Sequence, residues 1–213
     1  MSLHSLLTTG SMVGEQFCYH DIPERLDPFD NEAFEQSKTK FYAVCSNLKT
    51  GQAEYHLCPT LRAEQMQYLL ASASMPLVSR IVTVDGKELL DGGVCDSIPV
   101  KAMQKLGYDR LIVVLTRPKG YRKAPFRTGL AKFKYRRYPA FLQALSRRHE
   151  IYNQALDDLE AMEQAGQAFV IRPTQDLHIS RMEKNREKIQ LQYDLAYSDA
   201  ASQLDALAQF IQA

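Results

Sequence analysis

The strongest limit on the fold comes from residues 80–116, which read RIVTVDGKELLDGGVCDSIPVKAMQKLGYDRLIVVLT. Asp85 and Gly86 separate two short apolar runs, and this pair favours the type I′ turn of a β-hairpin. Pro99 then fits the first position of a helix, and Gly107 is a natural stop for it. The apolar run at 109–116 predicts a strand that is buried on both faces. A hairpin, a short helix and a buried strand in this order indicate an α/β sheet.

Similar patterns outside this stretch predict the remaining elements. Residues 40–48 and 53–57, with Gly51 between them, form a second hairpin signal. Residues 62–74 and 142–166 have helical periodicity, and residues 168–173 form a further strand signal. After residue 182 the pattern predicts two helices with a break near Ser198 and Asp199.

Composition excludes several classes of protein. The chain of 213 residues is 45% hydrophobic and 24% charged, which is typical of a globular domain with a real core. No apolar run approaches the roughly 18 residues of a membrane span, and the first residues do not resemble a signal peptide. The four cysteines and five histidines are scattered, without a C-x-x-C pair, so we expect reduced thiols, no metal and no cofactor. These features predict a cytoplasmic protein, and peripheral attachment of this protein to a membrane is compatible with them.

The basic residues are concentrated in one part of the chain. Residues 117–148 contain eleven Lys and Arg and no Asp or Glu, and six aromatic residues are interleaved with them. A solvated surface, an anionic membrane surface and nucleic acid are three interpretations of this block. Nucleic acid is the least favoured, because the spacing matches no nucleic-acid-binding motif. The candidate contacts for a membrane or another anion are Arg117, Lys119, Arg122, Lys123, Arg127, Lys132, Lys134, Arg136 and Arg137.

Asp91, Gly92 and Gly93 follow directly after a predicted strand. Two glycines permit a backbone path that other residues avoid, and they let another segment approach closely. Asp91 would then stand at the carboxyl end of a strand, where open α/β sheets place their chemistry. The alternative is a tight turn whose aspartate binds its own backbone.

Residues 69–123 closely resemble the C-terminal half of bacterial patatin-like phospholipases. The resemblance is carried by ASASMP, the hairpin, the D-G-G triplet, the DSIP helix start and the apolar strand, in that order. Residues 9–30 and 195–204 also look like one bacterial branch of that family. The resemblance implies a three-layer α/β sandwich with a central, mostly parallel sheet, here incomplete, and with added C-terminal helices. It also implies a serine hydrolase of lipid acyl esters, with Asp91 as the base and Gly92 and Gly93 shaping its loop.

The chain departs from the family pattern at the nucleophile. No G-x-S-x-G is present, and Ser11 directly follows a glycine, so it does not match the serine turn. A family-like glycine-rich oxyanion loop is also missing. We therefore expect a fragment that is inactive alone, with part of the catalytic domain in residues 1–117 and a basic and helical extension on the same core in residues 118–213. The truncated sheet should expose an apolar edge, which predicts self-association or partial disorder near the amino terminus.

Other residues near the motif have competing interpretations. Asp96 could serve as the base, but helix capping or a favourable interaction with the helix dipole is the preferred role. Cys95 is a weaker candidate nucleophile, because no histidine is placed near it by the sequence. His149 and His178 have no partner spacing that suggests catalysis. The alternative to an enzyme fragment is a non-catalytic module that uses the basic block to bind an anionic membrane or nucleic acid.

Overall fold

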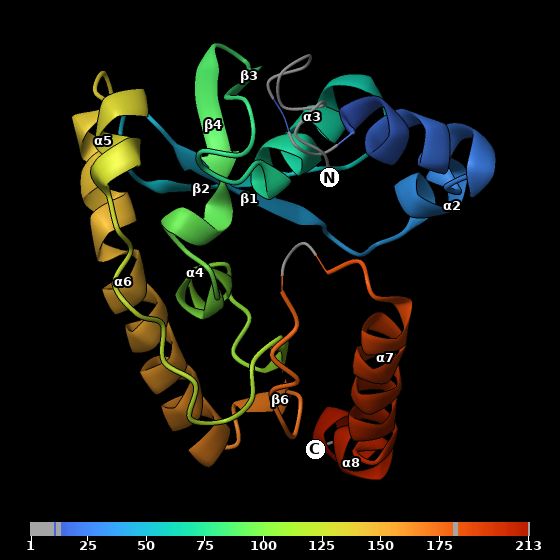
Figure 1. Ribbon diagram of the computed structural model, residues 1–213. Coiled ribbons are helices and arrows are strands. Elements are labelled where there is room, and N and C mark those ends of the chain that lie inside the picture. Colours follow the sequence, from blue (N-terminus) through green and yellow to red (C-terminus); the bar gives the residue numbers. More distant parts are fainter. Residues whose placement is uncertain (1–10, 12–13, 181–182, 213) are drawn as a thin grey trace. The chain divides into compact units, whose positions relative to one another are not determined.

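The computed structural model describes residues 11, 14–180 and 183–212, apart from the side chains of residues 63 and 64. Within it the chain forms two compact units (Figure 1). The first unit comprises Met1–Ile98 and Ala124–Tyr152, and the second comprises Pro99–Lys123 and Asn153–Ala213. Each unit contains helices and strands, which confirms the α/β class. The predicted disorder near the amino terminus concerns residues that lie outside the described part.

The first unit is built on a four-stranded antiparallel sheet in the order β2-β1-β4-β3. Both predicted hairpins are confirmed. Asp85 and Gly86 have φ angles of 49° and 72°, as a type I′ turn requires. The strands are β1 (Tyr42–Asn47), β2 (Ala53–Leu57), β3 (Val82–Val84) and β4 (Lys87–Asp91).

Helices cover both faces of this sheet. Leu89 faces a core that it shares with Tyr68 and Ala71 of α3 (Ala63–Ala73). Its neighbour Leu90 points to the opposite face, because successive strand residues alternate. There it packs with residues of two further helices, Ala131 of α5 (Gly129–Lys134) and Leu145 of α6 (Pro139–Gln164). This unit is therefore layered as helix, sheet and helix.

The expected central, mostly parallel sheet is not confirmed. Two hairpins supply the four strands of the larger sheet, and a short hairpin connection makes its strands antiparallel. Parallel pairing needs a long crossover, and in the described residues only β5 and β6 have one. The α/β class thus holds, whereas the parallel arrangement is limited to a two-stranded sheet.

The remaining elements of the first unit precede the sheet. A π-helix, η1 (Phe17–Leu26), is followed by α2 (Asn31–Gln36). Asp30 caps α2, because its side chain accepts a hydrogen bond from the Ala33 amide at 2.9 Å. These helices have no fully buried residues, so they lie at the surface of the unit.

The second unit contains α4 (Val100–Lys105), β5 (Leu111–Val114) and β6 (Ala168–Ile171), followed by α7 (Arg186–Ala201) and α8 (Leu204–Gln212). The prediction that β5 is buried on both faces is wrong. Leu111 is buried, but Ile112 and Val114, which share one face of the strand, are 49% and 70% exposed. The predicted break between the last two helices lies a few residues later, after Ala201.

Candidate functional site: the Asp-Gly-Gly turn

Asp91 is the last residue of β4 and leads into a short 3-10 turn, η2 (Gly92–Val94). Its amide donates to the Ser74 carbonyl at 2.9 Å, and the residue pairs with Cys45 of β1. The carboxylate is half-buried, and its Oδ1 accepts a hydrogen bond from the Gly93 amide at 2.7 Å. Its Oδ2 makes no hydrogen bond with the described residues. One oxygen thus holds the turn, while the other remains available to accept a proton.

Gly92 is required by the close approach of a neighbouring strand. A Cβ atom built on it would lie 2.2 Å from the Val44 carbonyl oxygen of β1, which no side chain tolerates. Gly92 and Gly93 have ordinary negative φ angles, so neither is needed for an unusual backbone path. At Gly93 a Cβ atom would lie 3.1 Å from Asp91 Oδ1, a tight but less severe contact. The glycines were predicted to let another segment approach closely, and this reason applies most strongly to Gly92.

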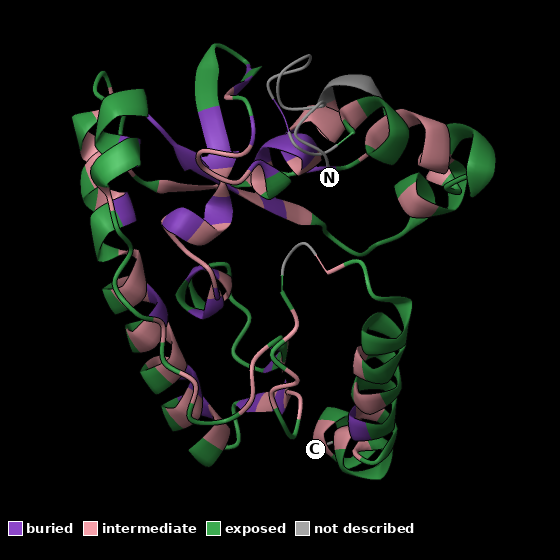
Figure 2. Cartoon of the chain, viewed as in Figure 1, coloured by how far each residue is buried: buried purple, intermediate pink, exposed green. Residues whose placement is uncertain are grey.

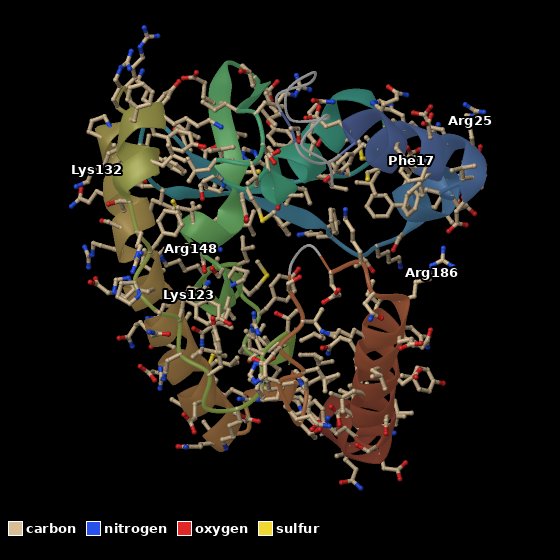
Figure 3. The ribbon with its side chains drawn as sticks, in the orientation of Figure 1. Phe17, Arg25, Lys123, Lys132, Arg148 and Arg186 are labelled. Atoms are coloured by element: carbon tan, nitrogen blue, oxygen red, sulfur yellow. The ribbon has the colours of Figure 1, made fainter. Side chains whose placement is uncertain are left out.

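Arg148 supports the turn from α6, a role that the sequence did not indicate. Its Nε donates to the Gly93 carbonyl at 2.6 Å, and the Ser97 hydroxyl donates to the same oxygen at 2.7 Å. Figure 3 labels Arg148 beside the turn that follows β4. In the sequence it is one cation of a basic block, and its separation from Gly93 leaves no local pattern. Tertiary packing alone brings these residues together.

Replacing Arg148 with Ala is expected to lower the free energy of unfolding by about 2 kcal/mol, since a hydrogen bond from a charged donor is lost at a half-buried carbonyl. Urea denaturation monitored by circular dichroism measures this change. Arg147→Ala is the matched control, because Arg147 makes an exposed ion pair with Glu150 and should change stability by less than about 0.5 kcal/mol. Equal effects of the two substitutions would contradict the role of Arg148.

Three serines near the turn donate hydrogen bonds to backbone carbonyls. Ser46 donates to the Asp91 carbonyl at 2.8 Å, and Ser74 donates to the Leu70 carbonyl at 2.7 Å. Ser97 donates to the Gly93 carbonyl, and Ser11 is buried. None of the Ser46, Ser74 and Ser97 hydroxyls donates to the Asp91 carboxylate. These three serines are therefore not positioned as nucleophiles activated by Asp91.

Asp96 and Cys95 have structural partners. Asp96 accepts a hydrogen bond from the Tyr55 hydroxyl at 2.6 Å, and no side chain caps α4. The predicted capping role of Asp96 is therefore wrong, because its carboxylate is bound to β2. The Cys95 thiol donates to the Gly51 carbonyl at 3.3 Å, and burial raises the pKa of this thiol. The thiolate is the nucleophilic form, so this environment disfavours Cys95 as a nucleophile.

The two histidines named above have other surroundings within their own units. The His178 side chain is 89% exposed and lies 3.6 Å from Asp176. His149 lies on α6, and its Nδ1 is buried without a hydrogen-bond partner among the described residues. Neither imidazole ring makes a hydrogen bond to Asp91.

The predicted basic contacts divide between the two units. In the second unit, Arg117 and Arg122 form ion pairs with Asp176 and Asp157 at 2.9 and 2.5 Å. Lys119 lies 3.9 Å from Glu160, and the backbone amide of Lys123 donates to the Asn153 side chain. The other candidates, all in the first unit, make no ion pair with a described residue; they are Arg127, Lys132, Lys134, Arg136 and Arg137. Three cations at the start of the block are thus paired with acidic neighbours, whereas the five later candidates make no ion pair with a described residue.

Fold and site together define an α/β protein with a half-buried carboxylate on a glycine turn. Residues 10–103 match the family model of the patatin-like phospholipases, which confirms the resemblance for this part of the chain, somewhat less than half of it. Residues 138–212 match the model of a domain of unknown function, DUF6363. No curated protein matches the chain. Asp91, Gly92 and Gly93 fall within the first match, and Arg148 falls within the second.

Proposed function

We propose that Asp91 is the general base of a patatin-like acyl hydrolase whose nucleophilic serine comes from sequence outside residues 1–213. The observation that carries the proposal is the Asp91 carboxylate itself. It ends a strand within the patatin-like match, it is oriented by the Gly93 amide, and its second oxygen makes no hydrogen bond with the described residues. The absence of G-x-S-x-G from the printed sequence completes the case for a separate nucleophile.

In the proposed reaction a serine hydroxyl approaches Asp91 Oδ2. The carboxylate accepts the hydroxyl proton while the serine oxygen forms a bond to the ester carbonyl carbon, and the carbonyl π electrons move to its oxygen. Collapse of this intermediate breaks the bond to the leaving alcohol, which takes the proton from Asp91. Water then attacks the acyl-enzyme by the same route and releases the fatty acid. Because carboxylates are weak bases at neutral pH, oxyanion donors must supply much of the rate acceleration.

The second sheet has only two strands in the described residues, β5 and β6, and its unpaired edges support the view that strands are missing from it. Ile112 and Val114 are apolar and exposed, and strands of a parallel sheet are normally buried on both faces. We propose that β5 and β6 belong to a larger parallel sheet completed by sequence outside this chain. In the isolated chain the same edge would favour self-association. We also propose that residues 1–117 belong to the catalytic domain and that residues 118–213 are an extension of it. The two family matches lie on either side of this boundary.

A serine-directed fluorophosphonate probe tests the missing nucleophile. The 213-residue chain should show no labelling above that of its heat-denatured form, because its site serines donate to backbone carbonyls rather than to a base. The full-length product of the gene should be labelled at a serine outside this chain. Labelling of the 213-residue chain at Ser11 or at any other serine would overturn the proposal.

A further inference from the structure

The helix α5 is held on the first unit by Ala131 and by Tyr135, the residue that directly follows the helix. Ala131 and Tyr135 are fully buried, and the Tyr135 ring packs edge-on against Phe141 at a centroid distance of 5.2 Å. The Tyr135 hydroxyl accepts a hydrogen bond from the Leu77 amide at 2.9 Å. These contacts fix the orientation of α5, so its outer residues form a defined surface.

The outer side of α5 combines apolar and cationic side chains. Leu130 and Phe133 are 69% and 70% exposed, and they lie on the same side of the helix because they are three residues apart. Figure 2 shows α5 mainly in the colour of exposed residues, and Figure 3 shows Lys132 extending outward from it. The Arg136 guanidinium lies 5.5 Å from the centre of the Phe133 ring. We call this surface the α5 face; it consists of Leu130, Lys132 and Phe133 of α5 together with Arg127, Arg136 and Arg137 of the flanking residues.

The charge of the α5 face is not neutralised by the protein. Its four cations are exposed and make no ion pair with a described residue. Residues 117–148 contain no Asp or Glu at all, although the chain as a whole carries almost equal numbers of acidic and basic residues. An anionic partner that also accepts two apolar side chains would match both the charge and the exposed apolar residues of the α5 face.

We propose that the α5 face binds an anionic lipid surface. Leu130 and Phe133 would enter the boundary between headgroups and acyl chains, and the four cations would contact the negative headgroups. Nucleic acid is less suited to this surface. Its backbone offers no apolar layer for Leu130, and the Phe133 ring is already contacted by Arg136.

The α5 face shares its support with the Asp-Gly-Gly turn. The segment 74–79 accepts a hydrogen bond from the Asp91 amide at the Ser74 carbonyl, and it donates one from Leu77 to Tyr135. The Lys134 ammonium approaches the Leu77 and Ser79 carbonyls at 3.5 and 3.3 Å, and partial burial lowers its pKa. Lipid binding at α5 would thus occur beside the segment 74–79, which also holds the Asp91 backbone. The inference does not depend on the proposed serine and aspartate pair.

Vesicle flotation with the 213-residue chain tests this inference without any measurement of catalysis. The chain should float with vesicles that contain phosphatidylglycerol and remain unbound with pure phosphatidylcholine. The triple variant Lys132→Ala, Arg136→Ala and Arg137→Ala should bind the anionic vesicles about 100-fold more weakly, since each cation near the surface contributes about 1 kcal/mol. Binding should also fall as salt is raised.

The matched control removes the same charge elsewhere. Lys38, Lys40 and Lys105 are exposed and make no ion pair with a described residue, so their combined replacement by Ala should leave vesicle binding unchanged. A second variant, Leu130→Ser with Phe133→Ser, keeps all charges and should also weaken binding by at least 10-fold. Circular dichroism verifies that each variant is folded.

Three results would overturn the inference. The first is absence of binding of the unmodified chain to anionic vesicles. The second is equal loss of binding in the triple variant and its control, which would indicate a general charge effect. The third is retention of single-stranded RNA by the α5 face without vesicle binding, which would assign the surface to nucleic acid.

Discussion

Asp91→Asn in the proposed full-length hydrolase is expected to lower esterase activity by about 10³-fold while the fold is retained. The amide oxygen of asparagine still accepts the hydrogen bond from the Gly93 amide, so the turn persists. Its other group is an NH₂, which does not accept the serine proton, and general base catalysis typically contributes 10²- to 10⁴-fold. Hydrolysis of a p-nitrophenyl ester measures the loss, and the melting temperature confirms the fold.

Asp96→Asn is the control for this experiment. Its amide oxygen keeps the hydrogen bond from Tyr55, and the residue is not proposed to touch the substrate. The activity of this variant should stay within about threefold of that of the unmodified protein. The substitution removes one negative charge outside the proposed catalytic pair and keeps the contact with Tyr55. Retained activity in Asp91→Asn, or a comparable loss in Asp96→Asn, would reject Asp91 as the base.

Gly92→Ala is expected to destabilise the first unit by about 3 kcal/mol or more, because the new methyl group would lie 2.2 Å from the Val44 carbonyl oxygen. Relief of this clash requires separation of β1 from the turn, which also displaces the Asp91 carboxylate. Urea denaturation of the 213-residue chain measures the change in the free energy of unfolding.

Gly129→Ala provides a matched substitution without a clash. Gly129 is the first residue of α5, has no atom within 4 Å of a built Cβ, and has a negative φ angle. Its replacement should change stability by less than about 0.5 kcal/mol. If Gly92→Ala is tolerated as well as Gly129→Ala, the close approach of β1 is not a constraint on the turn.

The two family matches meet at one turn. Asp91 and its glycines belong to the patatin-like match, whereas Arg148, which binds the Gly93 carbonyl, belongs to the DUF6363 match. The first part of α6 therefore contributes to the structure of the patatin-like region. Its arginine helps to hold the loop that carries the proposed base.

None of the helices in the described part of the chain is long and apolar enough to cross a membrane.

Local chemistry in the sequence was sufficient to predict the hairpins and the turn. Asp85 and Gly86 have few alternatives to a type I′ turn, and Gly51 adopts a positive φ angle of 66° between β1 and β2. The same holds for the turn at Asp91, because an aspartate followed by two glycines at the end of an apolar run is typical of a turn. The patatin-like resemblance was carried by the order of such local signals, and the family model confirms it for residues 10–103.

Long-range packing decided the rest. The pairing of β1 with β4 and the contact between Arg148 and Gly93 join segments that are distant in sequence. The exposure of one face of β5 likewise depends on how distant segments pack around the strand. The amino-acid sequence by itself determined the turns and the acidic residue, since these depend on φ angles and neighbouring side chains. Only the tertiary structure decided which cations form ion pairs, because an ion pair needs an acidic residue that folding brings close.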